Sequence, residues 1–528
     1  MLERHPIYKR NKELKKVYIM KEDASKRFEK NQLVEVLIED IGESGEGIGK
    51  ADGYTLFIKD ALVGDKIEAL ITKAKKNYGY ARVNRIIEPS ANRITPKCSD
   101  ASRCGGCQIQ ALSYESQLQF KEKKVKDNII RIGGFDKDFI EKITEPIVGA
   151  GIGEEYRYRN KAQFPIGTSK EGEIIAGFYA GRTHNIIPCK DCYIGVSENK
   201  EILNIILEYM RRNNITAYNE TNCKGLVRHV LIRKGFTSGQ IMVCLVLSYS
   251  GKVKQMEDGL EIIASLKNQE DLIDSLSVIP GMTSICVSIN SENTNVIMGN
   301  EIHYLWGAKV INDTIHLRDV NNDFAVIEGT GVTFEISPLS FYQVNPIQVE
   351  KLYSIAIEYA NLKGDEEVWD LCCGIGTISL CIAKDMEIKN AVSSEENHSE
   401  KSQIHGIEIV PEAIEDAKKN ASKNNIKNAE FICAPAEEYL PKHAKDIKAD
   451  VIIMDPPRKG MEEEALKVVV ETKPSRIVYV SCDPSTLARD LKYLCENGYE
   501  LTKVRPVDMF MHSVHVETVC LLSRKASV

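Results

Sequence analysis

The sequence predicts a multidomain α/β chain with a small β-barrel first, a central α+β domain next and a C-terminal domain built on a parallel sheet. At 528 residues the chain is longer than one hydrophobic core usually organises. Short alternating strands divided by glycine-rich turns begin near Gln32, and beyond about Leu339 strands and helices alternate regularly. The predicted boundaries are 1–28 for a basic mobile tail, 29–90 for the barrel, 91–340 for the central domain and 341–528 for the parallel-sheet domain.

Composition excludes several classes of protein. With 43% hydrophobic and 27% charged residues the sequence is that of a globular protein. Its apolar runs fall short of the roughly 20 residues that a membrane span needs, and the opening MLERHPIYKRNKELKK has no apolar core of a secretory signal. We therefore expect a cytoplasmic protein. No obligate protein partner is implied, and we expect a monomer.

Charge alone gives an ambiguous answer about nucleic acid. The net charge of -7 argues against a polyanion ligand, yet residues 1–30 hold ten Lys or Arg against five acids, and residues 73–97 hold seven against Glu88. Tyr78 and Tyr80 lie among Lys75, Lys76 and Arg82, a mixture suited to backbone attraction and base stacking. The segments GESGEGIGKADGY and LVGDKIEALI resemble the TRAM domain, an OB-like RNA-binding barrel. The alternative is a barrel that caps the fold without touching RNA.

Cysteine spacing predicts a metal site. Fifteen cysteines in a reducing compartment are not a disulfide framework. Cys98, Cys104 and Cys107 form CxxxxxCGGC, and Cys189 or Cys192 in PCKDC supplies a fourth thiolate. Soft sulfur ligands suit either zinc or an iron-sulfur cluster, and spacing does not choose between them. The alternative is a set of buried structural cysteines.

A strand, a glycine pair and a helix predict a nucleoside cofactor in VWDLCCGIGTISL. Gly374 and its neighbours allow close backbone approach, and Glu408 ends the next strand, where a carboxylate can bind ribose hydroxyls. Ser379 replaces the third glycine of GxGxxG, which favours S-adenosylmethionine over a dinucleotide. Asp455 in MDPPRKG follows another apolar strand at the same sheet edge. A tight turn without a ligand is the alternative.

A cysteine and a carboxylate predict covalent catalysis. Cys482 lies between an apolar strand and a helix, whose N-terminal dipole and free amides stabilise a thiolate. Thiolate addition to carbon 6 of uracil makes carbon 5 nucleophilic enough to accept a methyl group, and a base must then remove the proton from carbon 5. Glu517 in HSVHVETVCLL is the candidate base, because a buried carboxylate without a task is costly. A core cysteine and a paired structural acid are the alternatives.

Together these motifs resemble bacterial TRAM-containing, iron-sulfur RNA uracil-5 methyltransferases of the type that acts on 23S ribosomal RNA. The resemblance rests on CxxxxxCGGC, YRNKAQFP, GLVRHVLIR, SPLSFYQVN, DLCCGIGT, GIEIVPEAI, DPPRKG, SCDPSTLARD and PVDMFMHSVHVETV, and covers residues 31–528. It implies a Rossmann-like methyltransferase domain, S-adenosylmethionine, a 4Fe-4S cluster in the central domain and an RNA substrate. The residue roles it implies are Cys482 as nucleophile, Glu517 as base, Cys98, Cys104, Cys107 and Cys192 as cluster ligands, and Gln343, Cys372, Gly374, Thr377, Glu408 and Asp455 around the methyl donor or the uracil.

The sequence departs from the family pattern at one position, because Cys372 stands where an aromatic residue is usual; Thr377 is a variable position.

A uracil must leave its stack to reach Cys482, so Phe341 or Tyr342 is expected to stack on RNA bases. Candidate phosphate contacts are Arg157, Arg159, Lys161, Arg228 and Arg233, with surface salt bridges as the alternative. Two rival functions stay open: the same reaction on transfer RNA, and a non-catalytic RNA-binding protein.

Overall fold

The computed structural model describes residues 28–181, 183–256, 260–392, 403–443 and 447–526, so nearly all of the predicted tail lies outside the described residues. The chain forms two compact units that divide after Arg93. Among the described helices none is long and apolar enough to cross a membrane.

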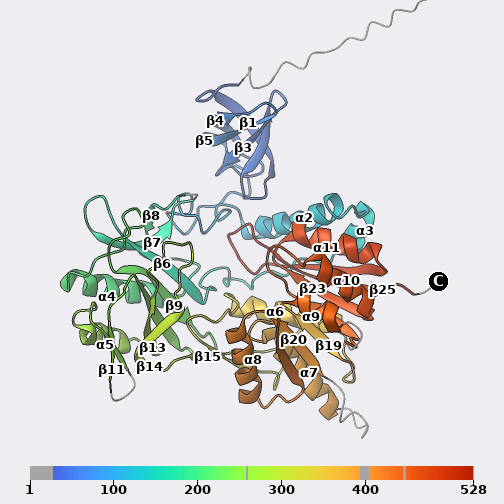
Figure 1. The fold of residues 1–528 in the computed structure, drawn as a ribbon. Helices are drawn as coiled ribbons and strands as arrows, with labels where there is room; N and C mark the ends of the chain where they lie inside the picture. The colour runs from blue at the N-terminus through green and yellow to red at the C-terminus, as the bar shows by residue number, and fades with distance from the viewer. Residues whose placement is uncertain (1–27, 182, 257–259, 393–402, 444–446, 527–528) are drawn as a thin grey trace, which may run out of the picture. The chain divides into compact units, whose positions relative to one another are not determined.

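The N-terminal unit is a closed five-stranded barrel, as the alternating pattern predicts (Figure 1). Alternate residues point inward, and Leu56, Ile58, Ile67 and Ile71 are completely buried in its core. The strand order is β1-β2-β3-β5-β4. The strands are β1 (Leu33–Ile41), β2 (Gly47–Ala51), β3 (Tyr54–Lys59), β4 (Lys66–Ala74) and β5 (Tyr78–Glu88).

The second unit contains a seven-stranded central sheet in the order β14-β13-β10-β9-β6-β7-β8. Helices α4 (Glu198–Arg212) and α5 (Gln269–Ser277) share an apolar core with one of its faces. The strands are β6 (Lys161–Thr168), β7 (Ile174–Tyr179), β8 (Ile186–Pro188), β9 (Val227–Lys234), β10 (Ile241–Leu247), β13 (Met282–Ile289) and β14 (Glu301–Gly307), and β11 (Val253–Gln255) pairs with β12 (Glu261–Ile263) beside them.

The C-terminal sheet also has seven strands, in the order β21-β20-β19-β22-β23-β25-β24. Its first five are parallel, so their carboxyl ends meet at one edge, and β25 runs antiparallel to β23 and β24. This is the doubly wound, mostly parallel sheet that the sequence predicts. The strands are β19 (Val368–Leu371), β20 (Ile404–Glu408), β21 (Ala429–Cys433), β22 (Val451–Met454), β23 (Arg476–Ser481), β24 (Tyr499–Val507) and β25 (Glu517–Arg524).

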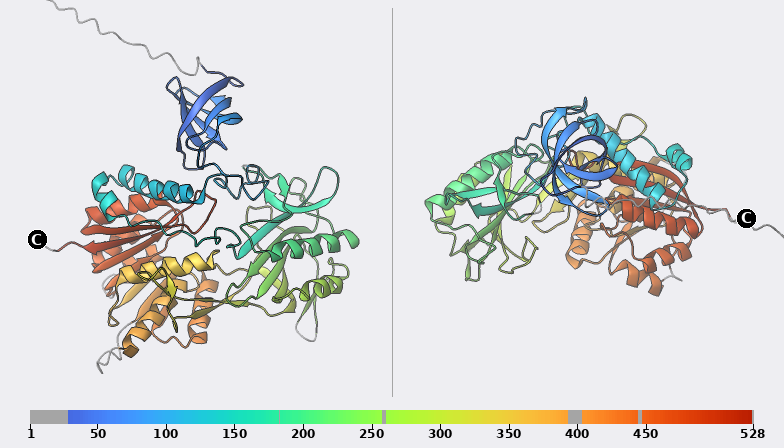
Figure 2. Two further views of the ribbon diagram at one scale, coloured as in Figure 1. Left: turned by 180° about the vertical axis from the view of Figure 1, so that it is seen from behind. Right: turned by 90° about the horizontal axis from the view of Figure 1, so that it is seen from above.

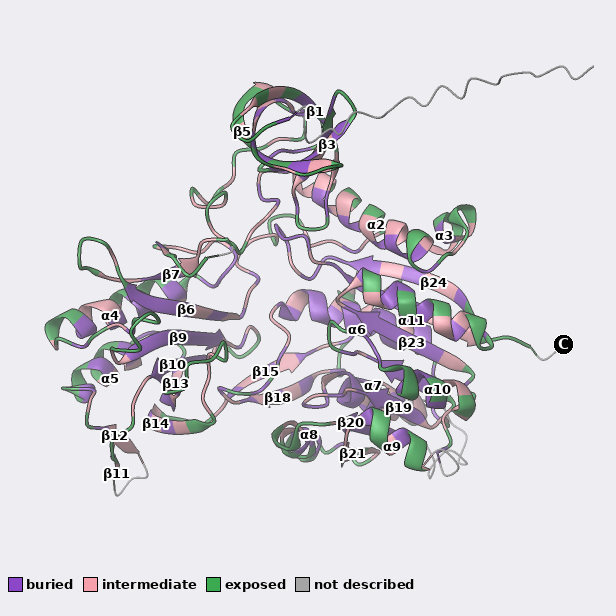
Figure 3. Cartoon of the chain, turned by 45° about the horizontal axis from the view of Figure 1, so that its top comes forward, coloured by how far each residue is buried: buried purple, intermediate pink, exposed green. Residues whose placement is uncertain are grey.

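Helices cover both faces of this sheet, whose inner strands β19, β22 and β23 are almost wholly buried (Figure 3). They are α6 (Pro346–Ala360), α7 (Thr377–Val392), α8 (Pro411–Lys423), α9 (Ala436–His443), α10 (Glu463–Thr472) and α11 (Pro484–Glu496). The polar segment 386–403 was predicted to be a surface insertion. Instead α7 continues to Val392, and 393–402 lie outside the described residues.

Two helices assigned by the sequence to the central domain belong to the C-terminal sheet. A helix near Tyr114 to Ile132 was predicted, and α2 (Tyr114–Arg131) confirms it. Both α2 and α3 (Lys137–Ile143) bury apolar residues in the core beneath β23 to β25 (Figure 2). The segment preceding the central sheet therefore packs on the sheet that follows it.

Candidate active site

The nucleophile and base predicted from the sequence lie at adjacent positions of neighbouring strands. Strands β23 and β25 pair antiparallel up to Ser481 opposite Thr518. Cys482 and Glu517 are the next residues outward from that pair, one on each chain segment. Asp455 follows β22, the other neighbour of β23, so three functional groups from distant parts of the sequence meet at one sheet edge.

The Cys482 thiol is protonated at rest. Burial raises its pKa to about 12, the carboxyls of Glu517 and Asp455 add to the shift, and Arg458 acts against it. The expected stabilisation by free helix amides is wrong, because the Asp483 side chain caps α11 by accepting from the amides of Ser485 and Thr486. The proton on sulfur must therefore leave when the substrate binds.

Glu517 has the character of a base tuned to neutral pH. Its side chain is 3% exposed, and burial, with a contribution from Asp455, raises its pKa to about 8, against the opposing charge of Arg458. Burial, together with the charge of Asp370, raises the pKa of Asp455 to about 7. A base whose pKa lies near the working pH removes a proton most effectively.

The glycine loop after β19 has an open side. Cys372, Gly374 and Gly376 have φ angles of 71°, 58° and 78°, in the left-handed region that strains a non-glycine residue. A side chain added at Gly374 would meet nothing within 4 Å, so a ligand can approach the backbone there. Glu408 accepts hydrogen bonds from the amides of Gly374 (3.1 Å) and Val410 (3.0 Å), which fixes its carboxylate beside the loop.

Three further residues belong to this edge and were missed by the sequence analysis. Asp370 is buried and accepts a hydrogen bond from Ser379, and burial raises its pKa to about 6. The Tyr353 hydroxyl lies 2.8 Å from the hydroxyl of Thr377. Arg458 is the cation that acts on both Cys482 and Glu517. Asp370 and Arg458 lie inside motifs that had been singled out, whereas nothing in the helix of Tyr353 pointed to the site.

The loop that carries Gln343 is fixed from two directions. Asn160 donates from its side chain to the carbonyl of Gln343 (2.9 Å) and from its amide to that of Val344 (2.8 Å). Phe341 is 68% exposed and free to stack on a base, but Tyr342 is buried with its hydroxyl on Asp313, so the stacking role suggested for Tyr342 is wrong.

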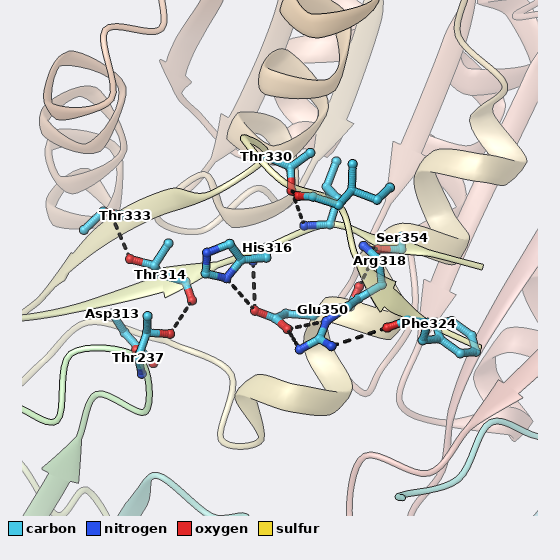
Figure 4. Close-up of polar contacts among 12 residues, drawn as sticks. Thr237, Asp313, Thr314, His316, Arg318, Phe324, Thr330, Thr333, Glu350 and Ser354 are labelled. Atoms are coloured by element: carbon cyan, nitrogen blue, oxygen red, sulfur yellow. Dashed lines mark hydrogen bonds and ion pairs between the residues drawn. The ribbon is translucent and has the colours of Figure 1, made fainter. Parts of the chain in front are cut away.

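A polar network holds the preceding ribbon, β15 (Ile311–Ile315) paired with β18 (Val332–Ile336), against α6 (Figure 4). Glu350 on α6 accepts from the amide of His316 (2.9 Å) and pairs with the guanidinium of Arg318. The short strands β16 (Arg318–Asp319) and β17 (Ala325–Val326) lie within this ribbon. Since α6 begins just after Gln343, the network fixes the base of the loop.

Five cysteines line one cavity in the second unit, with a volume of about 680 Å³. They are Cys98, Cys104, Cys107, Cys189 and Cys192, so the sequence prediction that these thiols converge is sound. Within the described residues, however, no three His, Cys, Asp or Glu side chains are arranged to hold a metal ion as they stand. The predicted metal site is therefore not confirmed by the geometry, although the donors are those that a cluster requires.

The two candidate fourth ligands differ. The Cys189 thiol is hydrogen-bonded to Cys192, and this bond lowers the pKa of Cys192 to about 6 while raising that of Cys189. Amides of Gly195 and Ile194 and the charge of Arg159 also favour the Cys192 thiolate. Cys192 is thus the thiol better prepared to act as a ligand.

Two of the predicted phosphate contacts are engaged in the fold. Arg157 pairs with Asp191 at 2.7 Å, and Arg228 donates to the carbonyls of Asn290 (2.8 Å) and Glu292 (2.7 Å). Neither guanidinium is free to bind RNA without breaking these contacts. In the barrel, by contrast, Phe57, Tyr78 and Tyr80 form a ring cluster with centroids 5.7 to 5.9 Å apart.

Comparison with known proteins agrees with this geometry. A family model described as tRNA (Uracil-5-)-methyltransferase matches residues 307–525, and the TRAM domain model matches residues 27–83. An uncharacterized RNA methyltransferase of Clostridium tetani is 43% identical over 496 residues, 94% of this chain and 97% of the relative. A second, from Listeria innocua, is 42% identical over 497 residues, 94% of this chain and 98% of the relative.

One solved structure has the same fold along most of the chain. It is the Pyrococcus abyssi tRNA (uracil-54, C5)-methyltransferase in complex with S-adenosyl-L-homocysteine, with a TM-score of 0.66 and 24% identity, covering 92% of this chain and 99% of that one. The fold and the sheet edge define a methyltransferase. More particularly, the chain belongs to the family of TRAM-domain RNA uracil-5 methyltransferases, which use S-adenosylmethionine.

Proposed function

We propose that the protein methylates carbon 5 of a uracil in RNA through a covalent adduct between Cys482 and carbon 6. The observation that carries the proposal is the meeting of Cys482 and Glu517 beside Asp455, at the end of the β23–β25 ladder. Nothing about core packing requires a thiol and two carboxyls, all with raised pKa values, at one sheet edge.

The chemistry follows from these groups. The Cys482 thiol releases its proton to solvent as sulfur bonds to carbon 6, and the electrons of the 5,6 double bond move to carbon 5 and oxygen 4. S-adenosylmethionine, when bound, would supply an electrophilic methyl group to carbon 5 and leave as S-adenosylhomocysteine. The Glu517 carboxylate then takes the proton from carbon 5, the double bond re-forms, and the carbon–sulfur bond breaks to return the thiolate.

The remaining residues have supporting roles. Asp455, with a pKa of about 7, is able to donate to a uracil carbonyl or accept from the ring N–H. The open glycine loop, with Cys372, Gly374 and Thr377, and the fixed carboxylate of Glu408 fit a nucleoside methyl donor, and Gln343 faces RNA or donor from the neighbouring loop. Phe341 stacks on a base displaced when the target uracil flips out.

A 4Fe-4S cluster is part of the proposal. Cys98, Cys104, Cys107 and Cys192 would hold it, since they supply four thiols to one cavity. The methyl transfer requires no redox step, so the cluster has a structural or RNA-positioning role. Iron analysis of anaerobically purified protein, with Cys192→Ser compared with Cys189→Ser, tests the assignment: only the Cys192 change should lose the iron.

The RNA class is also proposed. We favour 23S ribosomal RNA in the cytoplasm, with the protein acting as a monomer, because the cysteine pattern and TRAM barrel together resemble the ribosomal enzymes. Transfer RNA is the second candidate, since the matched family model and the Pyrococcus abyssi structure both carry transfer RNA in their names. The two RNA classes can be distinguished by incubating each purified unmodified RNA with wild-type protein or Cys482→Ala and then analysing its nucleosides. Only the true substrate should gain 5-methyluridine, and only with Cys482 present.

A further inference from the structure

Three cations gather where the central sheet meets the loop that carries Gln343. Lys161 begins β6 and lies directly opposite Arg233 on β9. Opposite residues of adjacent antiparallel strands project from the same face, so their side chains are neighbours. Arg159, two residues before Lys161, donates from Nε to the Lys161 carbonyl at 3.0 Å.

None of the three has a carboxylate partner among the described residues. Arg233 is 3% exposed; it donates only to the carbonyls of Pro338 and Ser340, and its Nε has no partner. The Lys161 ammonium forms no hydrogen bond or ion pair within the described chain, and burial together with Arg233 and Arg159 lowers its pKa to about 7. Arg159 differs from the other two, because it also lines the cysteine cavity, where its charge favours the Cys192 thiolate.

Arg228 on β9 likewise donates to backbone carbonyls, whereas two other cations of these segments have carboxylate partners. On the same two segments, Arg157 pairs with Asp191 at 2.7 Å and Lys234 pairs with Glu198 at 2.6 Å. The charges of Lys161 and Arg233 have no counter-charge among the described residues, and charge that is withdrawn from water costs free energy, so an anion supplied from outside would be favoured beside them. Lys161 keeps partial exposure, and a ligand can reach it.

The cluster also adjoins the loop of Gln343, a residue proposed to contact the RNA or the methyl donor. Asn160, between Arg159 and Lys161, makes the two hydrogen bonds to Gln343 and Val344 that fix the loop. Phe341, on that loop, is 68% exposed. An anion held by Lys161 would therefore lie next to a nucleotide entering the catalytic edge.

We propose that Lys161 and Arg159, with the buried charge of Arg233 behind them, bind a backbone phosphate of the substrate RNA beside the target nucleotide. This inference rests on the proposed function. The ammonium binds a phosphate oxygen as a point charge, and the guanidinium of Arg159 offers its terminal N–H groups. Binding completes the charge balance that the protein lacks.

The test measures RNA affinity without S-adenosylmethionine, so it does not depend on methyl transfer. Transcripts of 23S ribosomal RNA and unmodified transfer RNA are titrated against wild-type protein, Lys161→Met, Lys161→Arg and the control Lys170→Met, an exposed lysine in the β6–β7 turn. On the RNA that wild-type protein binds more tightly, Lys161→Met should weaken binding about 10-fold and reduce the slope of log affinity against log salt concentration by about 1. Lys161→Arg and Lys170→Met should bind this RNA like wild type.

Two further readouts separate this role from a structural one. Because the Lys161 ammonium repels its neighbours in the free protein, Lys161→Met should melt no lower than wild type. Because a phosphate favours the charged form, wild-type affinity should fall more between pH 6.5 and 8 than that of Lys161→Arg, whose guanidinium stays charged. The proposal is overturned if Lys161→Met binds RNA with wild-type affinity and salt slope, or if Lys161→Arg is as weak as Lys161→Met. If wild-type protein binds the RNA with the predicted dependence on Lys161 but transfers no methyl group to it, the proposed function fails while the phosphate contact stands.

Discussion

Replacing Glu517 by glutamine should stabilise the protein increasingly as the pH rises. The folded-state pKa of Glu517 is about 8, above its ordinary value of 4.5, because the carboxyl is buried and Asp455 lies nearby. The folded protein therefore holds a proton that the unfolded chain releases between these two values. For such a raised carboxyl, stability is highest below pH 4.5 and falls as the pH rises through 8.

The magnitude follows from the size of the shift. Each pH unit between the two pKa values costs about 1.4 kcal/mol, so wild-type protein loses about 3 kcal/mol between pH 5 and pH 7.5 through this one group. Glutamine has nearly the same shape and no charge to desolvate, and it escapes this loss. For a unit of more than 400 residues, about 3 kcal/mol corresponds to about 3 °C in the melting temperature.

The assay is thermal unfolding of wild-type protein, Glu517→Gln and the control Glu500→Gln at pH 5, 6, 7 and 8. Glu500 is an exposed residue of β24 that pairs with Ser523, at the other end of β25 from Glu517. The melting temperature of Glu517→Gln should exceed that of wild type by an amount that grows steadily with pH. The difference in melting temperature between Glu500→Gln and wild type should stay constant. A Glu517→Gln gap independent of pH would refute the claim that this carboxyl is held in a destabilised state for catalysis.

The other predictions concern chemistry, cofactor binding and assembly. Cys482→Ala should lose single-turnover methyl transfer while RNA affinity, measured by filter binding, is unchanged. Glu517→Gln should transfer a methyl group yet release RNA slowly, so a covalent complex should persist on denaturing gels; for wild type, turnover should rise with pH through about 8 as Glu517 ionises. Glu408→Gln should weaken S-adenosylmethionine binding at least about 10-fold in equilibrium dialysis, since a charged acceptor for ribose is lost. Lys121 and Asp508 form a completely buried ion pair at 2.6 Å; Lys121→Met alone should cost about 3–5 kcal/mol in urea unfolding, and adding Asp508→Leu should restore most of it, because the cost comes from the unpaired charge.

The parts of the site that were predictable from the sequence are those carried by short motifs on single strand ends. Cys482, Asp455 and Glu408 each follow an apolar strand, and parallel strands bring such positions to one edge whatever lies between them. Their identification needed only the strand pattern and the chemistry of the reaction.

What escaped prediction depends on packing between distant segments. The pairing of Lys121 with Asp508 attaches α2 to the C-terminal sheet across 387 positions of sequence, and no local pattern records that partner. The state of the Cys482 thiol was mispredicted for a similar reason: helix position suggested activation, but burial and two carboxyls outweigh it, and Asp483 already takes the helix amides. Local motifs identify groups, whereas their protonation is set by neighbours that only the fold supplies.

The central claim is that sulfur of Cys482 bonds to carbon 6 of the target uracil, and the most direct measurement is mass spectrometry of protein trapped on RNA containing 5-fluorouridine. Fluorine at carbon 5 cannot leave as a proton, so Glu517 cannot complete the elimination. After incubation with S-adenosylmethionine and digestion, the account predicts a methylated fluorouridine nucleotide attached to the peptide that contains Cys482. Attachment at another cysteine, or no adduct from a preparation that methylates ordinary RNA, would contradict it.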